Sequence, residues 1–184
     1  MNNSRGFTIV ELLIVIVVIG ILAAITIVAF NGIQQRAKNT STISAAQQSI
    51  KLIKAYRAAN DDTYPMSGTA CLTNTCTDYA GTAAAVDSGL RTNLGKIGNP
   101  PTSTPVAGSG KYYGIWYNIR AGAASYDGDS TRKLLLMYWL TGQAQDCGVS
   151  DVAIQATGEA WARSTNKYSY SYPADNTTAC WVSV

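Results

Sequence analysis

The apolar residues of this chain form one long uninterrupted run, followed by several shorter patterned segments. The run extends from Phe7 to Phe30, 24 residues in which Glu11 carries the only ionisable side chain. At about 1.5 Å of rise per residue, a helix of this length measures roughly 36 Å, which is enough to cross a hydrocarbon layer of about 30 Å. The run therefore predicts a membrane-spanning helix over residues 7–30.

A second pattern follows directly, because apolar residues continue to recur at steps of three and four. This stripe consists of Ile33, Ala37, Thr40, Ile43, Ala46, Ile50 and Ile53. Glutamines and lysines lie off the stripe. The spacing predicts that the helix continues as an amphipathic segment over residues 31–60 and packs its apolar face against a sheet.

The remaining residues divide into a polar connection and a strand-rich region. Residues 61–110 are rich in Gly, Pro, Ser, Thr and Asn, which is typical of a surface connection, and a short helix is expected near Thr82 to Ile97. Aromatic and branched runs in residues 111–184 predict strands. These are Tyr112 to Arg120, Lys133 to Leu140, Glu159 to Arg163 and Cys180 to Val184. With residues 121–131 as a hairpin connection, an antiparallel sheet covers the amphipathic helix, and the fold class is α+β.

Composition excludes several classes of function. The chain has 184 residues, room for the long helix and one domain of roughly 125 residues. It contains no histidine, which removes the commonest general base and the usual metal ligand, so we expect neither an enzyme nor a cofactor. The net charge of +3 is too small for the strongly basic footprint of a dedicated nucleic-acid-binding protein.

The junction before the apolar run is the most specific feature of the sequence. Residues 1–6, MNNSRG, are polar or small, and Gly6 directly precedes the first apolar residue. A secretory signal peptide has a shorter apolar core and a small-residue cleavage site. A plain signal anchor explains the length of the run but not the presence of Glu11, because a carboxylate in hydrocarbon costs a few kcal/mol unless it is neutral or paired with a cation.

The residues from Gly6 to Val15, GFTIVELLIV, resemble the processing and methylation motif of type IV prepilins, and the match continues through Ile19 to Ile25. The resemblance implies that residues 1–6 are a leader peptide, that a peptidase cuts after Gly6, and that the new terminal residue, Phe7, is N-methylated. It also implies that Glu11 meets the terminal ammonium of a neighbouring subunit during assembly. Val28 departs from the pattern, because many pilins have a helix-breaking proline there.

This resemblance implies a pilin fold, with a long N-terminal helix on a C-terminal antiparallel sheet. The expected partners are further copies in a helical filament, a prepilin peptidase and methyltransferase, an assembly platform with minor pilins, and the membrane before assembly. The precursor is expected in the cytoplasmic membrane with its N-terminus inside, and the assembled pilus outside the cell. Adhesion, twitching motility and DNA uptake all remain possible tasks, with glycans or DNA as possible ligands.

Two alternatives to a pilus subunit remain open. A pseudopilin of a type II secretion system would share the leader, the helix and Glu11. A membrane-anchored binding module that never polymerises would share the helix but leaves the Gly6-Phe7 junction and Glu11 unexplained.

Four cysteines lie beyond the apolar run: Cys71, Cys76, Cys147 and Cys180. An even number outside a membrane anchor favours disulfides in an oxidising compartment. A zinc site is the alternative, but the spacing lacks a C-x-x-C pair and histidine is absent. Of the three connectivities we favour Cys71 with Cys76 and Cys147 with Cys180, the second of which would bound a C-terminal loop.

Three further motifs are weak. The alternation Tyr168-Ser-Tyr170-Ser-Tyr172 predicts three rings on one face of an extended segment, for ordinary packing or for carbohydrate contact. Asp127-Gly-Asp129 is more typical of a turn than of a calcium loop. The glycosylation triplets at Asn39 and Asn176 are too short to carry a site.

Overall fold

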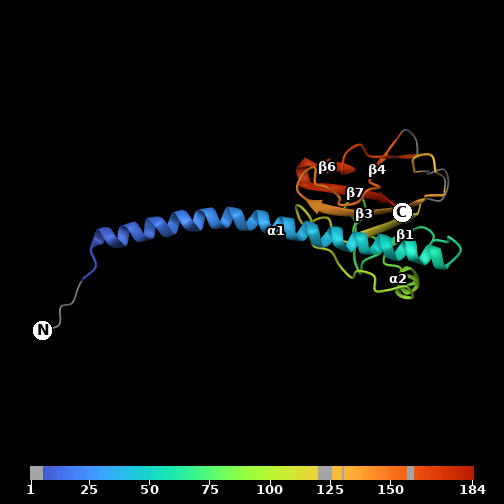
Figure 1. Cartoon of the computed structure of the whole chain (residues 1–184), viewed down its shortest axis with the longest axis horizontal. Helices are drawn as coiled ribbons and strands as arrows, with labels where there is room; N and C mark the ends of the chain where they lie inside the picture. Colours follow the sequence, from blue (N-terminus) through green and yellow to red (C-terminus); the bar gives the residue numbers. More distant parts are fainter. Residues whose placement is uncertain (1–5, 120–125, 130, 157–159) are drawn as a thin grey trace. The chain divides into compact units, whose positions relative to one another are not determined.

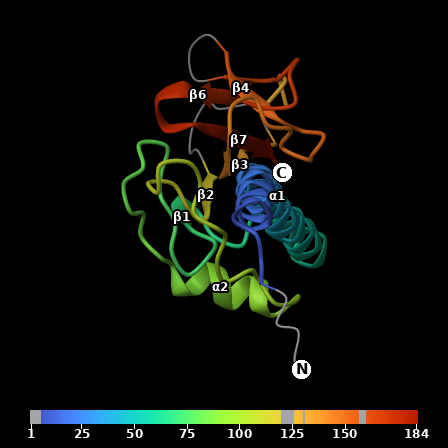
Figure 2. The ribbon, with the colours of Figure 1, turned by 90° about the vertical axis from the view of Figure 1, so that its left-hand side faces the viewer.

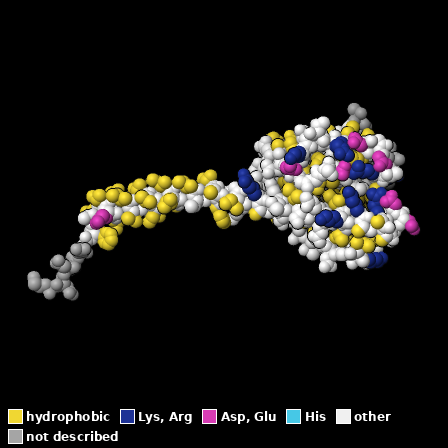
Figure 3. All heavy atoms as spheres, in the orientation of Figure 1, with side chains coloured by type: hydrophobic (Ala, Val, Ile, Leu, Met, Phe, Trp, Pro, Cys, Tyr) yellow, Lys and Arg dark blue, Asp and Glu magenta, His cyan; other side chains and the backbone are white. Residues whose placement is uncertain are grey.

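The computed structural model describes residues 6–119, 126–129, 131–156 and 160–184, and the chain divides into two units, Met1–Arg36 and Ala37–Val184. Helix α1 (Ile9–Ala59) supplies the helical residues of the first unit and the first element of the second. Its first part carries apolar side chains over its visible face, whereas charged side chains gather on the second unit (Figure 3). Among the described residues, α1 is the one helix long and apolar enough to cross a membrane, with a mean hydropathy of 3.3 over its most apolar stretch.

In the second unit, the stripe that α1 buries overlaps the predicted one in part. The buried positions are Asn39, Thr42, Ala46, Ser49 and Ile53. Of the predicted stripe, Ala46 and Ile53 are buried, and Ile43 and Ile50 are half-buried and pack against the same core. The stripe is rotated because small side chains let the helix approach the sheet, and the hydroxyls of Thr42 and Ser49 are satisfied within the helix, by donating to the carbonyls of Lys38 and Ala45.

The sheet is antiparallel and has five strands in the order β1-β2-β3-β7-β6 (Figure 1). Their bounds are β1 Thr69–Cys71, β2 Ile115–Ile119, β3 Leu134–Thr141, β7 Thr177–Ser183 and β6 Tyr170–Tyr172. A separate hairpin is formed by β4 (Ala153–Gln155) and β5 (Trp161–Arg163). This arrangement of one long apolar helix and an antiparallel sheet is the α+β fold that the sequence predicts.

The predicted elements differ from the observed ones mainly at their ends. The strand expected over Tyr112 to Arg120 begins only at Ile115, and its last predicted residue lies outside the described residues. Glu159 and most of the connection 121–131 also lie outside them. The last strand begins three residues earlier than expected, at Thr177. The short helix is α2 (Ser88–Gly95), narrower than predicted because the Asp87 carboxylate caps it by accepting the Leu90 N–H.

Both faces of the central strand β3 are buried. Leu134, Leu136, Tyr138 and Leu140 pack on the side of α1, in one core with Ala46 and Ile53. Leu135, Met137 and Trp139 pack on the opposite side, in a core rich in tryptophan that β5 and the segments around Cys76 and Tyr112 cover. Burial on two faces explains why this strand reads as a continuous apolar run instead of an alternating one.

Two disulfides connect the loops to these cores, Cys71 with Cys76 and Cys147 with Cys180. The pairing in the structure is the one favoured from the sequence. Cys71 and Cys76 lie in the tryptophan-rich core, whereas Cys147 and Cys180 lie in the core beneath α1. The hydroxyl of Tyr138 donates to the carbonyl of Cys147 at 2.5 Å. The second disulfide thus fixes the loop after β3 to the central strand β7.

Candidate processing and assembly site

The N-terminus of α1 is built by reciprocal contacts between Thr8 and Glu11. The Glu11 N–H donates to the Thr8 hydroxyl oxygen at 3.2 Å, and the Thr8 N–H donates to Glu11 Oε2 at 2.9 Å. The Thr8 hydroxyl also donates to the same Oε2 at 2.8 Å. Thr8 is the residue before the first helical position and Glu11 is the third within the helix, so the two form a capping box.

Thr8 is a residue that reasoning from the sequence missed. The signal was present, because Thr8-Ile-Val-Glu11 matches the S/T-x-x-E pattern that opens a helix. Both of these contacts to the carboxylate use Oε2. The capping box therefore fixes the position of the Glu11 carboxylate close to residue 7.

Gly6 and Phe7 precede this capping box. A Cβ atom added to Gly6 would meet no atom within 4 Å, so the fold of the chain does not require glycine at this position. Phe7 is 86% exposed. Residues 1–5 of the expected leader lie outside the described residues. A requirement for glycine at position 6 must therefore come from a molecule that acts on the chain.

The apolar surface of the first unit is the second component of the site. From Phe7 to Ile33, large apolar side chains are between 48% and 86% exposed. A contiguous surface of this size is not stable in water and is typical of a segment covered by lipid or by protein. Glu11 is the only ionisable group on it up to Phe30. The site thus consists of one carboxylate at the start of a long apolar cylinder.

The capping box supports a prediction about Thr8. Replacing Thr8 by alanine removes the hydroxyl that caps the helix, which costs about 0.5 to 2 kcal/mol of local helix stability, whereas serine keeps it. Hydrogen exchange of the Glu11 and Leu12 amides, which donate to the Thr8 hydroxyl and carbonyl, should therefore speed up about tenfold in Thr8→Ala in detergent micelles and remain unchanged in Thr8→Ser. Equal exchange in all three proteins would show that the capping contacts do not stabilise the helix start.

The other motifs of the sequence form no further site of this kind. Asp129 accepts hydrogen bonds from the Thr131 N–H and hydroxyl, and these contacts lower the pKa of its carboxyl. No cluster of three or more possible metal ligands occurs among the described residues. Asn39 is buried and its amide contacts the backbone of Thr141, which is a structural role. Asn176 ends the short helix η1 (Pro173–Asp175) in the left-handed conformation.

The three tyrosines predicted to share one face do not do so. β6 covers only Tyr170–Tyr172, and both of these rings pack on the tryptophan-rich core. Tyr168 instead packs against the core beneath α1. The prediction was wrong for Tyr168 because this residue lies in a bend at residues 165–169. The extended backbone begins only after the bend, at Tyr170.

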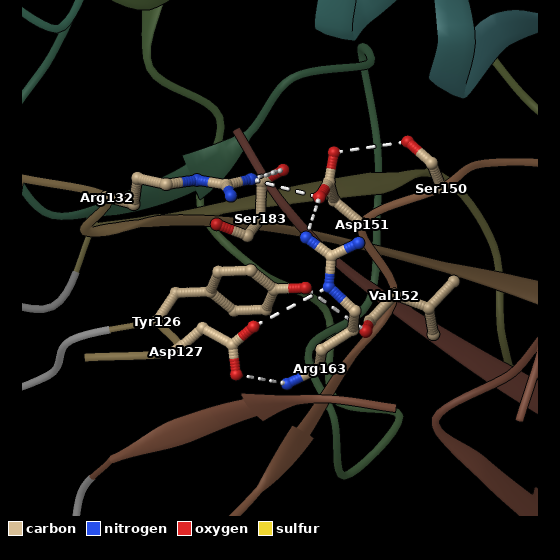
Figure 4. A network of polar contacts seen from close by, with 8 residues as sticks. All are labelled: Tyr126, Asp127, Arg132, Ser150, Asp151, Val152, Arg163 and Ser183. Atoms are coloured by element: carbon tan, nitrogen blue, oxygen red, sulfur yellow. Dashed lines mark hydrogen bonds and ion pairs between the residues drawn. The ribbon is translucent and has the colours of Figure 1, made fainter. Parts of the chain in front are cut away.

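A polar network attaches the β4–β5 hairpin to the end of the sheet. Figure 4 shows Asp151 between two guanidinium groups, and its Oδ1 lies 3.5 Å from Arg132 and 3.2 Å from Arg163. Arg163 also pairs with Asp127, and Arg132 lies over the ring of Tyr126 and donates to the Ser183 carbonyl. These charges are partly exposed, so each pair adds little stability. Their role is to orient the hairpin over the aromatic face.

Comparisons with known proteins bear on the N-terminal segment. A family model described as the prokaryotic N-terminal methylation motif matches residues 1–27, which include Gly6, Phe7 and Glu11. The type IV wide pilus major component PilA4 of Thermus thermophilus is 38% identical over 61 residues, which cover 33% of this chain and 47% of that protein. The chain is similar to a type IV pilin over a third of its length. It spans about half the length of this relative, and no solved structure matches it significantly.

The methylation motif occupies the part of the molecule where the capping box and the apolar surface occur. The second unit has a pilin-like arrangement, with a helix packed on an antiparallel sheet.

Proposed function

We propose that this protein is a type IV pilin, and specifically the major structural subunit of an extracellular type IV pilus. The observation that carries the proposal is the position of Glu11, a single carboxylate held by a capping box at the start of an otherwise apolar helix surface. An isolated carboxylate in hydrocarbon is unfavourable, but a carboxylate paired with a cation is tolerated. The new terminal amine of an incoming copy supplies that cation.

The proposed sequence of events begins in the cytoplasmic membrane, where lipid covers residues 7–30 and the N-terminus faces the cytoplasm. A prepilin peptidase cuts the peptide bond between Gly6 and Phe7, and the amine of Phe7 is methylated. The ammonium remains charged after methylation, so it can still pair with the carboxylate of Glu11 in a neighbouring copy. An assembly platform and minor pilins then place the apolar helices side by side, where neighbouring copies replace lipid as their cover.

Processing is tested by the mass of the mature protein. We expect a chain that begins at Phe7 and is one methyl group heavier than the unmodified fragment 7–184. A Gly6→Ala variant should accumulate as uncut precursor, although the fold has room for the added methyl group. Intact mass spectrometry of membrane and filament fractions measures both. A mature protein that keeps Met1, or that begins beyond Ala24, would contradict the proposal.

The second candidate is a pseudopilin of a type II secretion system, which would use the same Glu11 chemistry. Major pseudopilins typically bind calcium through a loop near the C-terminus. The feature that favours the pilus is the covalent bridge Cys147–Cys180, which orders the corresponding loop here without a metal. Electron microscopy of sheared cells separates the two. A pilus subunit appears in long surface filaments, whereas a pseudopilin remains in short periplasmic assemblies.

A further inference from the structure

The aromatic face of the sheet contains a cleft that lies outside the candidate processing and assembly site. It has a volume of about 440 Å³ and is lined by Tyr79, Gln155, Trp161, Tyr170, Tyr172 and Trp181. β4 and β6 both lie beside β7 (Figure 2). The lining residues come from β4, β5, β6, β7 and the loop that carries Tyr79. Its volume is in the range of small-molecule sites. All six residues belong to the second unit, so the cleft does not depend on the long apolar helix.

The rings of the cleft are held by other rings. The centroids of Trp161 and Trp181 are 5.0 Å apart, and that of Trp181 is 5.7 Å from Trp116. The ring centroids of Trp116 and Tyr79 are 6.2 Å apart, and the Tyr79 side chain is 61% exposed. The buried tryptophans therefore fix the base of the cleft, and the exposed ring of Tyr79 stands at its edge. A site whose rings are already ordered loses little entropy when a ligand binds.

On the opposite side, Tyr172 is held in a similar way. Its ring lies 5.7 Å from that of Trp139, which stacks on Tyr112 at 3.9 Å. Tyr170 is fixed through its hydroxyl oxygen, which accepts the Gln155 N–H at 2.8 Å. A phenol hydroxyl that accepts one hydrogen bond can still donate another, so Tyr170 can act as a donor to a ligand.

The chemistry of the lining is aromatic and polar but contains no acid, lysine or arginine. The polar groups are three phenol hydroxyls and the carboxamide of Gln155. Such groups match an uncharged ligand that presents apolar C–H faces and many hydroxyls, because the faces stack on rings and the hydroxyls form neutral hydrogen bonds. An anionic ligand would find no cation in the lining to compensate for the loss of its water shell.

We propose that this cleft binds a neutral saccharide, with a pyranose ring placed against Tyr79 and Tyr172 and its hydroxyls directed to Tyr170 and Gln155. This function goes beyond the filament role and does not rest on it. An apolar peptide is the competing occupant, and it fits less well because its backbone offers at most one N–H and one C=O per residue, whereas a sugar ring presents several hydroxyls to the phenols and the carboxamide of the cleft.

The test uses the full chain in micelles of dodecyldimethylamine oxide, a detergent without a sugar headgroup. Neutral sugars, namely glucose, galactose, N-acetylglucosamine and their disaccharides, are titrated while tryptophan emission is followed, since Trp161 and Trp181 line the cleft. A saturable change with at least one of them is expected. Glucuronate and a proline-rich peptide serve as the anionic and peptide probes and are expected to give no saturation.

Variants locate the binding site. Tyr79→Ala and Tyr172→Ala should each weaken binding about three- to tenfold, the loss expected for one stacked ring, whereas Tyr79→Phe should bind nearly as well as the native chain. Tyr113→Ala, a half-buried tyrosine outside the cleft, is the matched control and should leave binding unchanged. A thermal midpoint is measured for every variant to show that it is folded.

Three outcomes would overturn the proposal. These are no saturable response to any neutral sugar, a response that survives both alanine substitutions, or tighter binding of glucuronate or of the peptide. Filament formation by the same variants is scored separately. Normal pili together with lost sugar binding would support the cleft as a binding site. If the saccharide proposal fails, the proposed filament role is unaffected.

Discussion

Replacement of Glu11 by valine is expected to abolish filaments while leaving the protein in the membrane. The substitution removes the only ionisable group from the apolar run, so insertion becomes more favourable and recruitment of the next copy loses its charge pair. We expect surface pili to fall to a few per cent of the native number or below, because the loss is repeated at every subunit. Counting sheared filaments by electron microscopy, with the membrane-bound protein quantified in parallel, measures both effects.

The capping box provides a control that separates charge from helix capping. Glutamine at position 11 still accepts hydrogen bonds from Thr8 but carries no charge. If charge pairing drives assembly, Glu11→Gln should fail as completely as Glu11→Val. Normal pili from the glutamine variant would instead assign the role of this residue to the start of the helix, and normal pili from both variants would remove Glu11 from assembly altogether.

The second large effect is expected for the Cys147–Cys180 disulfide. It closes a loop with a sequence separation of 33, for which the chain-entropy model gives about 3 to 4 kcal/mol, whereas the separation of 5 between Cys71 and Cys76 gives about 2 kcal/mol. Paired alanine substitutions test each bridge better than a reductant, because all four cysteines are buried. We expect the thermal midpoint to fall by roughly 8 to 15 °C without the long bridge and by about half as much without the short one.

Chelation supplies the contrasting measurement. The described residues contain no cluster of three or more possible metal ligands, so EDTA is expected to leave the thermal midpoint unchanged. A fall of several degrees with EDTA, together with a small effect of removing the long bridge, would favour the pseudopilin alternative. Peptide mapping under non-reducing conditions identifies the bridges directly, and recovery of a crossed pair would contradict the assignment.

The sequence predicts best those elements whose pattern is long. The run from Phe7 to Phe30 and the strand from Lys133 to Leu140 were recognisable because a membrane-length helix and a strand buried on both faces each read as continuous apolar sequence. β1, β4 and β6 have three residues each, too few for a period to be seen. Their positions depend on pairing with distant strands.

The functional residues also divide into those that a local sequence pattern reveals and those that only the folded structure brings together. Glu11 and Gly6 stand out in a local motif, and Thr8 could have been found with them from the capping pattern. The aromatic cleft could not, because it joins Tyr79 to Trp161 and Trp181 across about a hundred residues of chain. The buried stripe of α1 was misplaced in part for a similar reason, since contact with the sheet favours small residues such as Ser49 that a search for apolar periodicity passes over.

The short edge strands limit how copies of this protein can join sheet to sheet. β1 and β6 form the two edges of the five-stranded sheet, and each has only three residues, whereas the central β3 and β7 have eight and seven. Exposed strand edges are templates on which copies of a protein pair and aggregate. Edges this short offer few backbone groups for such pairing, so the sheet is protected against aggregation even where many copies of the protein lie close together.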